Sequence, residues 1–152
     1  EALMNWEESK KAEKGAQQER KSLMDGIPRS FPALSRAQKT LGKAEKLGFK
    51  WQSEKQMLAK LEEEWQEINQ ALKENHKENL AEESGDFLLA FVSFCRYYSI
   101  EAEENLQEAI AKFMLRFRSM EEMYKELDNE DQQDIPNTLM KLWKKSKLGI
   151  RD

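Results

Sequence analysis

Hydrophobic residues recur every three or four positions along most of this chain, which is the spacing of one face of an α-helix. The pattern predicts four helices of ordinary length and one short basic helix. Their expected bounds are about 32–47, 54–74, 80–99 and 101–127, and the short helix opens at Pro136-Asn137. No segment shows the strict alternation of a half-buried strand, and no stretch repeats another. The pattern therefore predicts an all-α fold.

Residues at the predicted helix ends support these bounds. Gly48 follows Lys46 and is a good C-terminal stop, whereas Ser53 is a suitable N-cap for the next helix. The polar segment 3–21 also favours a helix, although Trp6 is its one large anchor. Turn residues separate that segment from the rest of the chain.

The two longest apolar patterns differ in kind. Residues 80–99, with FLLAFVSFCRYY at their centre, are apolar around most of the helix circumference, which predicts a central buried helix. Residues 101–127 carry apolar side chains at alternating spacings of four and three, which predicts a helix-packing seam. The seam residues are Leu106, Ile110, Phe113, Phe117, Met120, Tyr124 and Leu127.

Composition agrees with long amphipathic helices. Charged residues are 36% and hydrophobic residues 39% of 152 residues, with only six glycines and three prolines. This length suits one structural domain, since domains most often have roughly 100–150 residues. Within it we expect an N-terminal polar helix and loop, residues 1–31, followed by a helical domain, residues 32–152. Because the chain begins at Glu1 and not at Met, we expect it to be a fragment of a longer protein.

Charge and rare residues narrow the function. The net charge of -4 does not suggest a general nucleic-acid binder. The sequence has no apolar stretch long enough to span a bilayer and no signal-peptide pattern, so we expect a cytoplasmic protein. One histidine, His76, and one cysteine, Cys95, exclude a disulfide framework and a Cys/His zinc site. We expect His76 to be exposed and Cys95 to be buried, both in structural roles. Any chemistry is therefore expected to use carboxylates.

Two pairs of carboxylates have the spacing of one helix side. Glu64 and Glu67 are three residues apart, as are Glu83 and Asp86. Roughly five such pairs arise by chance among so many acids, so either pair alone is more often a solvated helix face. The second pair, however, precedes the most apolar segment and lies in the opening turns of its helix. If the two helices are antiparallel, all four carboxylates converge and require a cation such as Mg²⁺ or Mn²⁺.

Basic and aromatic residues near the C-terminus offer a complement to these acids. Lys112 and Arg116 flank the seam. Either their aliphatic stems cover apolar surface while their charged groups stay in water, or the two side chains bind phosphate oxygens. Trp143 is either a core anchor of the last helix or a platform for a base, whereas Trp51 and Trp65 are expected to pack. The glycines match no phosphate-binding loop, so a phosphate site needs metals and basic side chains.

These residues resemble a known family. Glu63-Glu64-x-x-Glu67, fifteen further residues and Glu83-x-x-Asp86 resemble the EExxE and ExxD signature of the MazG-like nucleoside triphosphate pyrophosphohydrolases. The segments IPRSFPALSRAQKTLGKAEKLGFKW and ESGDFLLAFVSFCRYYSIEAEENLQEAIAKFMLRFRSME extend the likeness over nearly the whole chain. In particular, the chain is similar to the C-terminal MazG domain of two-domain members, a resemblance that is compatible with an N-terminal MazG domain in the full-length protein.

The resemblance implies a homodimer whose long helices form a four-helix core. It implies Mg²⁺-dependent hydrolysis of nucleoside triphosphates to the monophosphate and pyrophosphate. The implied metal ligands are Glu64, Glu67, Glu83 and Asp86. Glu63 would be a supporting carboxylate, Lys112 and Arg116 would bind the phosphate chain, and Trp143 would lie near the base.

Two departures and two alternatives accompany this hypothesis. Asn79 stands where the family often has a lysine, so the sequence leaves open whether one phosphate contact is kept, and Ser84 replaces an apolar residue within ExxD. A catalytically degenerate helical dimerisation or adaptor domain would keep the same helices without activity. A dUTPase-like relative that selects pyrimidines would share the metals and differ in the base pocket.

Overall fold

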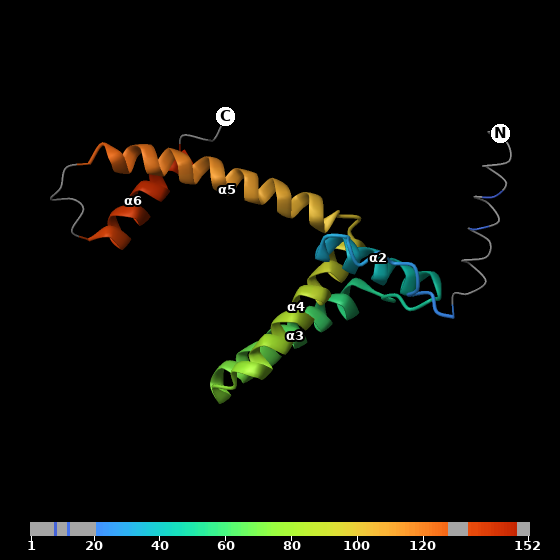
Figure 1. Ribbon diagram of the computed structural model, residues 1–152. Coiled ribbons are helices and arrows are strands. Elements are labelled where there is room, and N and C mark those ends of the chain that lie inside the picture. The colour runs from blue at the N-terminus through green and yellow to red at the C-terminus, as the bar shows by residue number, and fades with distance from the viewer. Residues whose placement is uncertain (1–7, 9–11, 13–20, 128–133, 149–152) are drawn as a thin grey trace. The chain divides into compact units, whose positions relative to one another are not determined.

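The computed structural model describes residues 8, 12, 21–127 and 134–148, and within these ranges it contains helices and no strand. The all-α prediction is therefore confirmed. Figure 1 labels five helices along the chain. They are α2 (Ala33–Lys46), α3 (Glu54–Glu74), α4 (Lys77–Tyr97), α5 (Ala102–Lys125) and α6 (Ile135–Leu148). The helix expected over residues 3–21 falls almost entirely outside the described residues.

The chain divides into two compact units, Glu1–Glu103 and Glu104–Asp152, and each is considered by itself. In the first unit, α3 and α4 form a helical hairpin and lie side by side, and α2 packs against α4 (Figure 1). The antiparallel arrangement that the sequence analysis required is thus present, because only a two-residue connection separates α3 from α4.

Local capping sets the ends of the hairpin helices. Ser53 Oγ accepts a hydrogen bond from the Gln56 N–H at 3.2 Å, as an N-cap does. Asn75 ends α3 in the left-handed conformation, with φ of 54°. His76, which is exposed, then caps α4 because its Nδ1 accepts the Asn79 N–H at 3.1 Å. For this reason α4 begins at Lys77 and not at about residue 80.

The core of the first unit joins α2, α4 and the start of α5. Val92, Cys95 and Ala102 are buried together, with partly buried side chains from α2 around them. The buried Gln38 connects the same segments, because its Oε1 accepts the Ala102 N–H at 2.9 Å and its Nε2 donates to the Ile100 carbonyl at 3.0 Å. Cys95 is buried as expected.

Arg96 makes a second connection between α4 and α2. Its Nε and one terminal nitrogen donate to the two carboxylate oxygens of Glu45 at 3.1 and 2.7 Å. Its other terminal nitrogen donates to the Gln38 carbonyl at 3.0 Å. Gly42 allows the guanidinium to approach, since a Cβ there would lie 2.9 Å from Arg96. Each end of this ion pair therefore has its partner, and we call Arg96 and Glu45 the anchor pair.

The prediction of an α4 buried around most of its circumference is wrong for this chain. Leu88, Leu89 and Phe91 are exposed to 58%, 43% and 45%. Among the described residues of the first unit, only α2 and α3 pack against α4, so these two helices cover part of its surface and leave a broad apolar face open.

In the second unit, an aromatic contact connects α5 with α6. The rings of Phe113 and Trp143 have centroids 5.1 Å apart, and Met120 and Leu142 are buried. The seam expected on α5 is buried only in part, because Leu106 and Ile110 are about half exposed. None of the described helices is long and apolar enough to cross a membrane.

Candidate functional site

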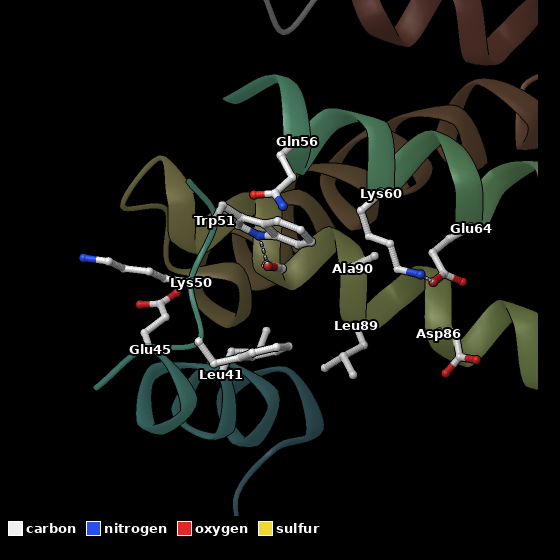
Figure 2. A pocket seen from close by; sticks show the side chains of 12 residues that line it. Leu41, Glu45, Lys50, Trp51, Gln56, Lys60, Glu64, Asp86, Leu89 and Ala90 are labelled. Atoms are coloured by element: carbon white, nitrogen blue, oxygen red, sulfur yellow. Dashed lines mark hydrogen bonds and ion pairs between the residues drawn. The ribbon is translucent and has the colours of Figure 1, made fainter. Parts of the chain in front are cut away.

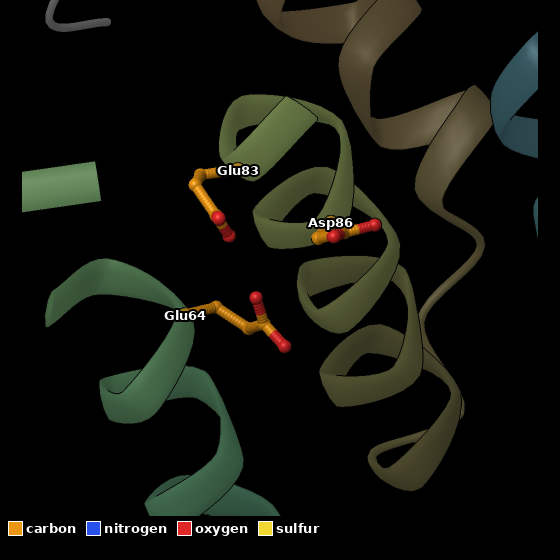
Figure 3. A group of neighbouring side chains, drawn as sticks. All are labelled: Glu64, Glu83 and Asp86. Atoms are coloured by element: carbon orange, nitrogen blue, oxygen red, sulfur yellow. The ribbon is translucent and has the colours of Figure 1, made fainter. Parts of the chain in front are cut away.

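The helical hairpin brings together acids from both predicted pairs. Glu64 on α3 faces Glu83 and Asp86 on α4, as Figure 3 shows. One carboxylate oxygen of each residue lies within 4.8 Å of the others. The convergence follows from the three-residue spacing on α4 and from the antiparallel course of the two helices. We refer to these three residues as the acid cluster.

The position of Glu83 and Asp86 in their helix differs from the expectation. We expected the opening turns, where the helix dipole favours anions, but α4 begins at Lys77 and both acids follow its first turn. The dipole effect falls off within that turn. The repulsion within the acid cluster must therefore be offset by cations.

Glu64 is the most deeply placed member of the acid cluster. Its residue is only 5% exposed, and its Oε1 lies 2.6 Å from Lys60 Nζ. Its Oε2 is buried without a hydrogen-bond partner among the residues that the structure describes. A buried carboxylate oxygen without a partner is costly, so this atom points to a group that the protein itself does not supply.

Two further acids lie beside the cluster. Glu67 is exposed, and its pKa is raised because its carboxyl shares a hydrogen bond with Glu83 and also lies near Glu64. Glu63 is exposed and contacts Lys60, whose Nζ is 3.2 Å from Glu63 Oε1. Hydrogen bonds to Glu64 and Glu63 raise the pKa of Lys60, which stays charged. One lysine therefore faces two carboxylates, those of Glu63 and Glu64.

A pocket of about 310 Å³ adjoins the acid cluster. Figure 2 shows Glu64 and Asp86 at one end of it and Trp51 at the other. The indole N–H of Trp51 donates to Ser93 Oγ at 2.7 Å, which fixes the ring as part of the wall. Sequence analysis placed Trp51 among the packing residues and missed this pocket. Its position after the stop at Gly48, at the connection between two helices, was the only available signal.

The predicted phosphate- and base-binding residues belong to the second unit. Lys112 is exposed, whereas Arg116 is partly buried and its Nε has no partner among the described residues. Trp143 is partly buried against Phe113, which matches its possible role as a core anchor of α6. Lys147 Nζ lies 5.8 Å from the centroid of the Trp143 ring.

The acid cluster suits a hard divalent cation. All its donors are carboxylate oxygens, which Mg²⁺ and Mn²⁺ prefer over nitrogen or sulfur. The unpartnered Glu64 Oε2 is a second observation that is compatible with a cation at this place. Fold and site together define an all-α protein with a carboxylate site compatible with metal binding.

Comparison with known proteins identifies the family. Residues 52–121, which contain all the predicted acids, match the MazG nucleotide pyrophosphohydrolase domain. The nucleoside triphosphate pyrophosphohydrolase of Escherichia coli K12 is 41% identical over 125 residues, covering 80% of this chain and 46% of that protein. The nucleoside triphosphate pyrophosphohydrolase/pyrophosphatase MazG of Thermotoga maritima is 34% identical over 145 residues, 95% of this chain and 54% of that protein. The chain belongs to the MazG-like family, as its motifs indicated.

The match covers most of this chain but only part of each relative. The uncharacterized protein YabN of Bacillus subtilis is 40% identical over 146 residues, which are 95% of this chain and 29% of that protein. This chain spans about half the length of the first two relatives and less of YabN. The likeness therefore concerns one portion of longer proteins.

Proposed function

We propose that this chain is a metal-dependent nucleoside triphosphate pyrophosphohydrolase. It would convert a nucleoside or deoxynucleoside triphosphate and water into the monophosphate and pyrophosphate. The observation that carries the proposal is the acid cluster with its buried, unpartnered Glu64 oxygen. The names of the Escherichia coli and Thermotoga maritima relatives support the same activity.

The proposed metal ligands are the carboxylates of Glu64, Glu67, Glu83 and Asp86, with Mg²⁺ as the cation and Mn²⁺ as a substitute. Glu63 supports them from beside Lys60. When bound, the cation neutralises triphosphate charge and lowers the pKa of a bound water. Lys60 holds one oxygen of Glu64 and thereby leaves the other free for coordination.

The reaction is an in-line displacement at the α-phosphorus. The oxygen of water forms a bond to that phosphorus, and the bond from phosphorus to the bridging oxygen of the β-phosphate breaks. A nearby carboxylate that does not hold the cation accepts the proton from water. Lys112 and Arg116 would stabilise the charge that develops on pyrophosphate, and Trp143 would contribute to nucleotide binding.

A homodimer belongs to the same proposal. The exposed apolar residues of α3 and α4 include Leu58, Leu72, Leu88 and Phe91, and a second hairpin packed on them would complete a four-helix core. The substitution Leu88→Glu should convert the dimer into monomers in sedimentation velocity experiments. A wild-type chain that sediments as a monomer at high micromolar concentration would contradict this part.

The direct test is product identification. The chain is incubated with Mg²⁺ and a panel of nucleoside and deoxynucleoside triphosphates, and the expected products are monophosphate and pyrophosphate. Glu64→Gln should abolish pyrophosphate release without loss of helix in circular dichroism, whereas exposed Glu62→Gln on the same helix should retain it. Diphosphate with phosphate as products, or no turnover at all, would overturn the proposal. Activity restricted to dUTP would indicate the pyrimidine-selective alternative.

A further inference from the structure

We propose that Lys60 makes the acid cluster selective for Mg²⁺ over Ca²⁺. It does so because it occupies one oxygen of Glu64 and thereby restricts that carboxylate to binding a cation through the other oxygen. This inference rests on the proposed function and deepens it, since it concerns the choice of cation at the same site. Sequence analysis did not single out Lys60, because its role depends on the burial of Glu64.

The two carboxylate oxygens of Glu64 have different surroundings. Lys60 Nζ lies 2.6 Å from Oε1, and Figure 2 shows the ammonium group at that oxygen. Oε2 is buried and has no hydrogen-bond partner among the described residues. Glu64 therefore offers one free oxygen to a cation, whereas a carboxylate without such a contact offers two.

Lys60 is itself held in place by two acceptors. Its Nζ also donates to Glu63 Oε1 at 3.2 Å, so one ammonium group connects two neighbouring carboxylates. Glu63 and Glu64 follow Lys60 on α3 at spacings of three and four residues, which places all three side chains on one side of the helix. The ammonium group is therefore positioned to stay at Oε1 of Glu64 while a cation occupies Oε2.

Mg²⁺ and Ca²⁺ differ in how they use a carboxylate. Mg²⁺ is small, requires near-ideal octahedral geometry and keeps several waters, so a carboxylate that binds through one oxygen suits it. Ca²⁺ takes about 6–8 oxygen ligands in a more flexible geometry, and one carboxylate often supplies two of them. While Lys60 holds Oε1, Glu64 cannot supply both oxygens. Loss of that contact gives Ca²⁺ an additional ligand that Mg²⁺ does not need.

Two variants separate the hydrogen bond of Lys60 from its charge. Lys60→Met and Lys60→Gln both remove the charge, but only Lys60→Gln keeps a donor for Glu64 Oε1. The chain contains a precedent, because Gln70 Nε2 donates to Glu74 Oε1 at 2.6 Å on the same helix and at the same spacing of four residues. Lys55→Met, at an exposed position of α3, is the matched control for the loss of one positive charge. Circular dichroism of each variant establishes that the helices are retained.

Calorimetric titration of the chain with Mg²⁺ alone and with Ca²⁺ alone, without nucleotide, gives the ratio of the two dissociation constants. The ratio cancels the general gain in affinity that follows from losing a positive charge, because both ions carry the same charge. We expect Lys60→Met to shift the ratio in favour of Ca²⁺ by about threefold to tenfold. Lys60→Gln and Lys55→Met should keep the wild-type ratio. Lys60→Ala, which also lacks a donor, replaces Lys60→Met if that variant loses helix.

Equal ratios in Lys60→Met and Lys60→Gln would overturn the inference, and so would a wild-type chain that binds neither ion. The failure of the proposed function would look different. If the ratio depends on the donor at position 60, the inference stands even when no pyrophosphate is released from any triphosphate. If pyrophosphate is released with Mg²⁺ but every variant keeps the wild-type ratio, the proposed function stands and the role assigned to Lys60 is wrong.

Discussion

Two charged sites lie on α4, and they differ in how completely their charges are paired. At the anchor pair, Arg96 donates to both oxygens of Glu45 and to the Gln38 carbonyl, so each charged group has its partner. At the acid cluster, Lys60 contacts one oxygen of Glu64, and the other, buried oxygen of Glu64 has no hydrogen-bond partner among the described residues. A fully paired ion pair holds two helices together, whereas a buried oxygen without a partner is compatible with a ligand-binding site.

The largest expected effect is a loss of activity when a residue of the acid cluster is replaced. Asp86→Asn should reduce pyrophosphate release by roughly a thousandfold, because loss of a metal ligand removes several kcal/mol of transition-state stabilisation. Its urea midpoint should stay close to that of the wild type, since Asp86 is exposed. Steady-state turnover and urea unfolding measure the two quantities. Turnover within a few-fold of wild type would remove Asp86 from the proposed ligands.

The second prediction concerns stabilisation by the cation. Mg²⁺ at about a hundred times its Kd should stabilise the folded chain by about 2.7 kcal/mol, because it binds the folded state preferentially. Thermal melting with MgCl₂, compared with NaCl at equal ionic strength, measures the shift. Asp86→Asn should lose most of this shift, and a shift of the same size in wild type and variant would count against a metal at the cluster.

Replacement of a residue of the anchor pair should lower the stability of the fold and leave the response to Mg²⁺ unchanged. Arg96→Ala should lower the free energy of unfolding by about 1–3 kcal/mol, a range that allows for the partial exposure of both partners. The variant should keep its Mg²⁺-dependent stabilisation because Arg96 does not contact the acid cluster. Urea unfolding measures the change, and Arg36→Ala, at an exposed position on α2, is the control. Equal stability of the two variants would show that the anchor pair contributes little.

The smallest effect is a dependence on pH. Hydrogen bonds and charge from Arg96 hold the pKa of Glu45 below its ordinary value of about 4.3. An acid with a lowered folded pKa contributes stability above its unfolded pKa, and this contribution is lost as pH falls through the folded pKa. Unfolding free energy should therefore fall between about pH 5 and pH 3, with a smaller slope in Glu45→Gln. The same slope in both chains would contradict the assignment to Glu45.

Part of the structure could be predicted because it depends on local periodicity. The helix of residues 54–74 was predicted with the bounds that α3 has, since Ser53 supplies a local cap. The start of α4 was misplaced because the cap is His76, a residue that rarely serves as one and that sits in a polar run. The acids were found by their spacing, which places Glu83 and Asp86 on one helix side whatever surrounds them.

The sequence by itself determined the helices, the two pairs of acids and the family, because helical period and motif spacing are properties of neighbouring residues. Only the tertiary structure decided that Glu64 is buried with one oxygen unpartnered, that Trp51 lines a pocket, and that one face of α4 stays exposed. The physical reason is that spacing shows which residues share a helix face. Burial and charge pairing depend on which other helix covers that face, and this is set by packing between residues far apart in the chain.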